Sequence, residues 1–261
     1  MKIIRVLFIG DIVGEPGCLT VKKVLPKLKA EHKINFVVAN AENAAQGNGI
    51  TQEEAQFLFE CGCNVLTGGN HSFRQSGVFN LFKNNEHVLR PVNLSKRGPG
   101  RGYCIFVSEE FSVAVINLMG QVYLNAVSSA FDEVDYWLKK INSRLVLVDF
   151  HAEATGEKGA LAHYLDGRVS AVIGTHTHVQ TNDAKILPKG TGFITDVGMV
   201  GPSDDSVLGV CAGCVVRKIV TNLPTRFEVK DGLCLFNAVL LDLNSETGCC
   251  EKISKIFLDS I

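Results

Sequence analysis

Two histidines separated by one residue, His176 and His178, follow a short apolar run in the second half of the chain. The run, Val169–Ile173, contains β-branched residues and lies between Gly167 and Gly174, which is typical of a buried strand. In extended backbone, side chains at positions i and i+2 point to the same side, so both imidazoles can bind one ion or substrate group. Two solvated loop histidines explain the pair by itself equally well, and polar residues elsewhere decide between the two interpretations.

Side chains that can bind metals also follow four other runs that the sequence predicts to be strands. The runs are 3–9, 34–39, 64–67 and 145–150, and the residues that follow them are Asp11, Glu42, Asn43, Asn70, His71 and His151. Taken singly, each residue is explained as well by a turn, a helix N-cap or a buried histidine. The carboxyl ends of neighbouring strands in an α/β fold share one edge, however, so all of these groups can meet in one crevice.

The candidate ligands are imidazoles, carboxylates and amide oxygens, with no thiolate among them. The set is Asp11, Glu42, Asn43, Asn70, His151, His176 and His178. Such ligands suit manganese, iron or zinc better than a soft metal. The set exceeds the three or four ligands of a single catalytic zinc ion and fits two ions that share one carboxylate.

This ligand set predicts phosphate chemistry. Asp11 and Glu42 are its only anionic members, so two dications leave the site positively charged and attractive to a phosphate ester. A water shared by two metal ions loses a proton near neutral pH, and the metal-bound hydroxide can attack phosphorus in line with the leaving oxygen. His71 is not needed as a ligand, and histidine titrates in the range required to give that oxygen a proton.

Composition indicates an ordinary globular protein. The chain has 261 residues, of which 46% are hydrophobic and 20% charged, and its net charge is −1. We expect one domain over residues 1–261, because no linker, repeat or low-complexity segment interrupts the sequence. The net charge argues against binding of long nucleic acid. No apolar segment approaches the roughly 18 residues of a membrane span, so we expect a cytoplasmic protein without membrane contact.

Alternation of helical and extended patterns predicts the architecture. Helices are expected at 18–32, 51–60, 128–143 and 210–221, the second opened by a capping box of Thr51 and Glu54. A hairpin is expected from 102–107 and 112–117, and further strands at 191–195, 226–229, 233–243 and 250–258. Strand–helix units followed mainly by strands predict sheets packed together, with helices on the outside.

The nine cysteines indicate a reduced protein rather than a disulfide framework. Cys211-Ala-Gly-Cys214 and Cys61-Gly-Cys63 could bind zinc or perform redox chemistry, but burial as small apolar side chains is the favoured explanation. Two other enzyme classes are disfavoured. The glycine-rich segment 10–17 matches neither the dinucleotide nor the P-loop pattern, and no G-x-S-x-G elbow supports a serine triad.

With these residues the chain resembles the calcineurin-like metallophosphoesterases, whose blocks are D-x-H, G-D-x-x-D, G-N-H-[DE], a single H and G-H-x-H. The corresponding segments are Gly10-Asp11, Ala41-Glu42-Asn43, Gly69-Asn70-His71, His151 and Gly174–His178. The chain departs from this pattern at Val13, Glu42 and Thr175, where the family has histidine, aspartate and glycine. These departures, with segments such as GDIVGEPG, NAENAAQGNGIT and VIGTHTHVQT, resemble the YmdB-like bacterial 2′,3′-cyclic-nucleotide 2′-phosphodiesterases over nearly the whole chain.

The resemblance implies an α/β fold of the four-layer α/β/β/α sandwich type with mixed sheets, and two metal ions, iron or manganese, with zinc as a further option. It implies that one ion is held by Asp11, Glu42, Asn43 and His178, and the other by Glu42, Asn70, His151 and His176. Asn43 then replaces the histidine missing at position 13, and His71 is the proton donor. The resemblance also implies hydrolysis of small cyclic nucleotides (2′,3′-cyclic and, as a second class, 3′,5′-cyclic), a cytoplasmic location and a homo-oligomer.

Two other functions remain open at this stage. The chain could be a regulatory protein that binds metal and nucleotide with little turnover. It could also be a phosphomonoesterase or a protein phosphatase that uses the same metal ions. Intact nucleotide after hours with Mn²⁺ or Fe²⁺ would favour the first alternative, and a comparison of monoester with diester substrates tests the second.

Overall fold

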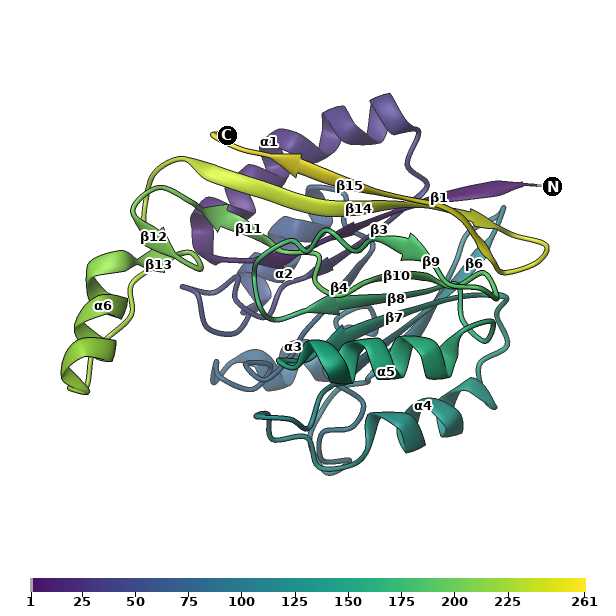
Figure 1. Cartoon of the computed structure of the whole chain (residues 1–261), viewed down its shortest axis with the longest axis horizontal. Helices are drawn as coiled ribbons and strands as arrows, with labels where there is room; N and C mark the ends of the chain where they lie inside the picture. Colours follow the sequence, from purple (N-terminus) through teal and green to yellow (C-terminus); the bar gives the residue numbers. More distant parts are fainter. Residues whose placement is uncertain (1) are drawn as a thin grey trace.

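Two mixed β-sheets lie face to face in the computed structural model, which describes residues 2–261 (Figure 1). The first sheet has the strand order β2-β11-β14-β1-β3-β4, and β15 pairs with β14. Its strands are β1 (Ile3–Ile9), β2 (Asp11–Ile12), β3 (Phe36–Asn40), β4 (Val65–Thr67), β11 (Met199–Pro202), β14 (Cys234–Asn244) and β15 (Cys250–Leu258). Because β1, β3 and β4 run parallel, their carboxyl ends lie at the same edge of the sheet.

The second sheet has the order β5-β6-β7-β8-β10-β9. Its strands are β5 (Tyr103–Val107), β6 (Ser112–Met119), β7 (Leu145–His151), β8 (Ala171–Thr175), β9 (Lys185–Ile186) and β10 (Gly192–Ile194). The four central strands are parallel, while β5 and β9 are antiparallel edges. The buried central strands read as nearly continuous apolar runs, as expected for strands covered on both faces.

Helices cover the outer face of each sheet, which gives the four layers α/β/β/α (Figure 1). The helices α1 (Gly14–His32), α2 (Gln52–Glu60) and α3 (Val78–Asn84) pack on the first sheet, and α4 (Ala130–Leu138) and α5 (Thr155–Leu165) pack on the second. Apolar side chains from both sheets, among them Phe8, Val38, Leu147 and Ile173, form a third core between them. The structure therefore confirms the expected fold class.

A small hairpin of β12 (Ser206–Val207) and β13 (Val210–Cys211) continues into α6 (Ala212–Thr221). This unit projects from the body of the molecule, and no residue of α6 is buried (Figure 1). Within residues 2–261, the structure contains no helix with the length and apolar character needed to cross a bilayer.

Several predicted elements are confirmed, including the hairpin of β5 and β6 and the capping box before α2, in which Thr51 and Glu54 bond each other's backbone. Two helix predictions were wrong in part. The first helix begins at Gly14, because Val13 and Gly14 donate backbone hydrogen bonds to the distant carbonyls of Val200 and Asn43, a tertiary contact with no local cap signal. The helix expected at 128–143 is α4, which ends at Leu138 instead of residue 143.

The expected strand at 226–229 is absent from the described chain, where only an isolated bridge joins Val229 to Val210. The helix α3 was not predicted, and α5 was recognised only as a charged segment. The prediction that these cysteines are buried holds for Cys63, but Cys61, Cys211 and Cys214 are partly exposed.

Candidate metal centre

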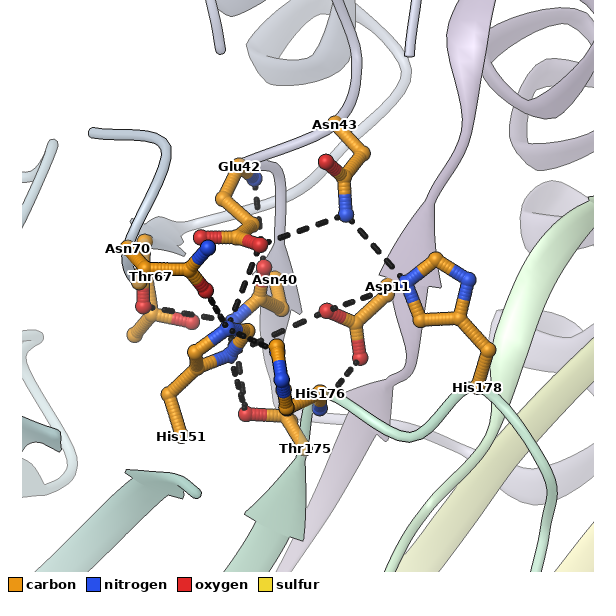
Figure 2. Close-up of polar contacts among 12 residues, drawn as sticks. Asp11, Asn40, Glu42, Asn43, Thr67, Asn70, His151, Thr175, His176 and His178 are labelled. Carbon is orange, nitrogen blue, oxygen red and sulfur yellow. Dashed lines mark hydrogen bonds and ion pairs between the residues drawn. The ribbon is translucent and has the colours of Figure 1, made fainter. Parts of the chain in front are cut away.

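All seven expected ligands lie together where the carboxyl ends of the two sheets meet (Figure 2). The first sheet contributes four of them through β2 and the loops after β3 and β4: Asp11, Glu42, Asn43 and Asn70. The second sheet contributes the last residue of β7 and the two residues beyond β8: His151, His176 and His178. The site is therefore assembled across the core between the sheets, and the expected proton donor His71 lies beside it.

His151 occupies the centre of one half of the site and is fully buried. Its Nε2 lies 3.1 Å from Oε1 of Glu42, 3.0 Å from Oδ1 of Asn70 and 3.0 Å from Nδ1 of His176 (Figure 2). Ligand atoms of Glu42, His151 and His176 all lie within 4.8 Å of one another. An imidazole, a carboxylate and a second imidazole at this spacing can hold one divalent cation.

The other half of the site is formed around Asp11. Its Oδ2 accepts the backbone N–H of His176 at 3.2 Å. Its Oδ1 is buried, has no hydrogen-bond partner among the described residues, and lies 3.9 Å from Nε2 of His178. A buried carboxylate oxygen without a partner is costly unless a cation neutralises it. This oxygen and Nε2 of His178 are therefore suitably placed to bind a metal ion.

Asn43 joins the two halves, but its amide is turned away from the expected orientation. Nδ2 lies 3.2 Å from Nε2 of His178 and donates to Oε1 of Glu42 at 3.3 Å, while Oδ1 lies 2.7 Å from Nδ1 of His71. Only the oxygen of an amide binds a metal ion. To act as a ligand, Asn43 must rotate its amide by half a turn, which would place Nδ2–H toward His71.

The loop after β8 holds both of its histidines in positive φ, with φ 103° at His176 and 65° at His178. Non-glycine residues in such regions cost about 1–3 kcal/mol each and persist only where surrounding contacts determine them. One such contact is the hydrogen bond from Nδ1 of His178 to the carbonyl of Leu208 at 3.1 Å, which directs Nε2 toward Asp11.

A second support for this loop is a buried ion pair that sequence reasoning did not identify. Asp196 accepts hydrogen bonds from the backbone N–H and the hydroxyl of Thr177 at 3.0 and 2.7 Å, and Nζ of Lys158 lies 2.7 Å away. Asp196 and Lys158 are both fully buried. No local sequence pattern signals this pair, because its partners belong to α5 and to the segment after β10.

A chain of buried hydrogen bonds orients His151 from behind. Its Nδ1 lies 2.9 Å from Oγ1 of Thr175, which in turn donates to Asp149 at 2.7 Å, and Asn40 donates to the other oxygen of Asp149 at 3.1 Å. Hydrogen bonds of this kind fix the ring orientation of a metal-binding histidine. Asp149 precedes His151 by two positions in β7, so strand alternation could have placed them on one side.

The estimate of local charge from the sequence, which counted Asp11 and Glu42 alone, was incomplete. Asp149 and Asp196 are buried near the site, and Oε2 of Glu153 lies 2.9 Å from Nε2 of His176. The additional carboxylates bind lysine, threonine or histidine groups. They reduce the net positive charge expected for a site with two metal ions.

Burial and the neighbouring charges shift the pKa values of this cluster in opposite directions. Burial raises the pKa of Asp11 well above its usual range. Burial also opposes ionisation of Glu42, but the charge and hydrogen bond of His151 outweigh it and lower the pKa of Glu42 to about 2. Burial disfavours the charged form of His151, yet Glu42, Asp11 and Asp149 raise its pKa to about 9. The neighbouring carboxylates thus strongly favour a positive charge at His151.

Gly69 allows the loop before Asn70 to approach this cluster. A Cβ atom at residue 69 would lie 2.2 Å from Cδ2 of His151 and 2.3 Å from Oε2 of Glu42. Neither neighbour can move without leaving its place in the site. The glycine is therefore required for the close approach of backbone to the ligands.

His71 lies at the edge of the cluster with its ring partly exposed. Its Nδ1 lies 2.7 Å from Oδ1 of Asn43 and 3.4 Å from Oε1 of Glu42, and its backbone N–H donates to Oε2 of Glu42 at 3.0 Å. Burial lowers the pKa of the ring despite the nearby charge of Glu42. The sequence suggested that His71 is free, but the structure shows that Asn43 holds its ring.

Comparisons with known proteins agree with this architecture. A model of the family described as "YmdB-like protein" matches residues 7–256. The chain is 42% identical over 98% of its length to a 2′,3′-cyclic-nucleotide 2′-phosphodiesterase of Bacillus subtilis, of which 97% is covered.

Two solved structures have closely similar folds. One is a protein of Thermus thermophilus described as hypothetical, with a TM-score of 0.93, 38% identity and coverage of 99% of this chain and 100% of that chain. The other is a phosphatase of Mycoplasma pneumoniae, with a TM-score of 0.94, 32% identity and coverage of 99% and 94%. By the match to residues 7–256 and the identity to the Bacillus subtilis protein, the chain belongs to the YmdB-like family of metallophosphoesterases.

Proposed function

We propose that this chain hydrolyses 2′,3′-cyclic nucleotides at a site with two metal ions. The chain is an enzyme of the class that hydrolyses phosphoester bonds, as its curated relatives are named. The substrate is inferred from the name of the Bacillus subtilis relative. The observation that carries the proposal is the place of Glu42, whose Oε1 lies 3.1 Å from Nε2 of His151 and 3.3 Å from Nδ2 of Asn43, and so reaches both halves of the site.

We assign the ligands by the two halves of the cluster. One ion is held by Asp11, Glu42, Asn43 and His178, and the other by Glu42, Asn70, His151 and His176. The unpartnered Oδ1 of Asp11 and the 4.8 Å cluster of Glu42, His151 and His176 support this division. Imidazole, carboxylate and amide ligands favour iron or manganese, with zinc as the third option.

When bound, the metal ions supply Lewis acidity that neutralises phosphate charge and promotes ionisation of a water. The chain's own residues position the substrate and the proton. As water adds to phosphorus, the bond from phosphorus to the 2′ oxygen breaks, and that oxygen takes a proton from His71. The amide of Asn43 lies beside the ring of His71, and when its oxygen turns to a metal ion its Nδ2–H faces that ring, which keeps the donor beside the ligand cluster.

The location, domain organisation and assembly of the chain are part of the proposal. The shared core between the two sheets supports one domain over residues 1–261. The cysteine content supports a cytoplasmic location. The apolar side chains of Val216, Ile219 and Val220 are exposed by 55%, 72% and 75%, which supports a homo-oligomer that covers them.

The proposal is tested by hydrolysis assays with chelated protein reloaded with Mn²⁺, Fe²⁺ or Zn²⁺. The substrates are 2′,3′-cyclic nucleotides, 3′,5′-cyclic nucleotides, a chromogenic diester and the matching monoester. Metal-dependent opening of the 2′,3′-cyclic substrate to the 3′-phosphate is expected, with the diester cleaved faster than the monoester. Faster cleavage of the monoester would instead favour a phosphomonoesterase or protein phosphatase. Tight binding of a nucleotide that stays intact for hours would favour a regulatory protein.

A further inference from the structure

A pair of cysteines lies at the junction between β13 and α6, apart from the metal centre. Cys211 is the last residue of β13 and the N-cap of α6, and Cys214 belongs to the first turn of that helix. Both side chains are partly exposed. The proposed hydrolysis uses neither thiol, so their arrangement needs a separate explanation.

The two thiols lie on the same side of the first turn of α6, because the N-cap residue and the third residue of a helix face each other. No side-chain cap hydrogen bond closes this N-terminus, and the backbone N–H groups of Cys214 and Gly213 and the thiol of Cys214 are the neighbouring groups that favour the charged form of Cys211. The sulfur of Cys211 thus occupies the position where a helix N-terminus stabilises negative charge. These neighbours lower the pKa of Cys211, while the proximity of Cys211 raises the pKa of Cys214.

The backbone around Cys211 is held by contacts that do not involve the thiols. Its N–H donates to the carbonyl of Glu228 at 3.0 Å, and Ala212 donates to the carbonyl of Asp205 at 3.2 Å. Cys211 also pairs with Ser206 in the hairpin. The sulfur atoms can therefore react while the surrounding backbone keeps its place.

The other closely spaced pair has a different environment. Cys63 is buried, and burial raises its pKa and that of Cys61. Burial likewise raises the pKa of Cys18 and Cys104 to about 12. Since the thiolate is the reactive form of cysteine, these thiols are inert by comparison with Cys211.

We propose that Cys211 and Cys214 form a redox-active dithiol that exchanges with small-molecule disulfides. The thiolate of Cys211 attacks one sulfur of the small disulfide, whose own S–S bond breaks and releases one small thiolate. Cys214 then loses its proton and attacks the sulfur of Cys211, which releases the second small thiolate. The two cysteine protons pass to the two small thiols, and two electrons pass from the cysteines to the small disulfide.

The test uses the full chain in buffers with increasing ratios of oxidised to reduced glutathione, followed by trapping with N-ethylmaleimide and tryptic digestion. Peptide 190–217 contains Cys211 and Cys214 as its only cysteines, and peptide 34–74 contains only Cys61 and Cys63. As the ratio rises, peptide 190–217 should no longer carry the two N-ethylmaleimide labels. Its mass should then be that of the unlabelled peptide less two hydrogen atoms, because a disulfide has formed. Peptide 34–74, the internal control, should stay labelled at those ratios.

Single substitutions assign the roles of the two thiols. Cys214→Ser should accumulate the mixed disulfide on Cys211, because the resolving thiol is absent. Cys211→Ser should react about tenfold more slowly at Cys214. Two labels on peptide 190–217 at every ratio, protection of both thiols by bound Zn²⁺, or equal rates in the two variants would each overturn the proposal. These readouts do not depend on hydrolysis, so a failed phosphodiesterase assay leaves them decisive.

Discussion

Nε2 of His178 lies 3.9 Å from Oδ1 of Asp11, a buried carboxylate oxygen that has no hydrogen-bond partner among residues 2–261. Asp11→Asn should therefore have opposite effects on binding and on stability. We expect Mn²⁺ affinity to fall at least about tenfold, because a charged ligand is lost. In chelated protein the same change should raise the free energy of unfolding by about 1 kcal/mol, because it removes a buried group whose ionisation is opposed by burial and whose Oδ1 has no hydrogen-bond partner among those residues.

Isothermal titration with Mn²⁺ and chemical denaturation of chelated protein measure the two effects. His163→Ala, at an exposed residue of α5, is the control and should change neither. Unchanged Mn²⁺ affinity in Asp11→Asn would exclude this carboxylate as a ligand.

His71→Ala should slow hydrolysis without removing metal. Loss of a general acid lowers kcat by about 100-fold to 10,000-fold. His71 contacts Asn43 and Glu42 but belongs to neither proposed ligand set, so metal content measured by mass spectrometry should stay at the wild-type level. Full turnover in the variant, with metal retained, would remove His71 from the mechanism.

Lys158→Met should be strongly destabilising. The substitution keeps the apolar stem but leaves Asp196 buried without its cation, which lies 2.7 Å away in the wild type. Breaking a buried pair in this way costs about 3–5 kcal/mol. The matched control is Lys2→Met in the exposed pair of Lys2 with Glu110, where less than about 1 kcal/mol is expected. Equal losses in the two variants by urea denaturation would contradict the structural role assigned to Lys158.

Asp183→Asn should remove a stabilisation that depends on pH. Hydrogen bonds from Thr181 at 2.6 Å and from the N–H of Thr195 at 3.1 Å hold the pKa of Asp183 below its usual value, although burial opposes them. A lowered folded pKa stabilises the fold above the unfolded pKa of about 3.9, and this stabilisation is lost as pH falls through the folded value.

At pH 7 the variant should therefore lose about 1 kcal/mol of unfolding free energy, and this difference from the wild type should shrink below about pH 4. Denaturation curves at pH 7, 5 and 3 measure it, with the exposed Asp204→Asn as the control. A difference of constant size from pH 7 to pH 3 would show that the carboxylate charge is not its source.

Short apolar runs that end in polar residues were sufficient to predict much of the fold. The runs before Glu42, Asn70 and His151 are strands of the structure, because a strand buried on both faces has a local apolar signature. The helix after Thr51 was also predictable, since its capping box lies within one turn. The elements that failed, such as the expected strand at 226–229, depend on contacts with segments distant in the chain.

The sequence by itself determined which side chains end the buried strands, because strand pattern and residue type are local properties. Only the tertiary structure decided how those ends meet across two sheets, and that the loop of His176 and His178 rests on the buried pair of Lys158 and Asp196. It also decided that the amide of Asn43 faces His71 with its oxygen, and that Cys211 and Cys214 are partly exposed. Ion pairs, burial and side-chain orientation arise from residues far apart in the chain, so no local pattern can specify them.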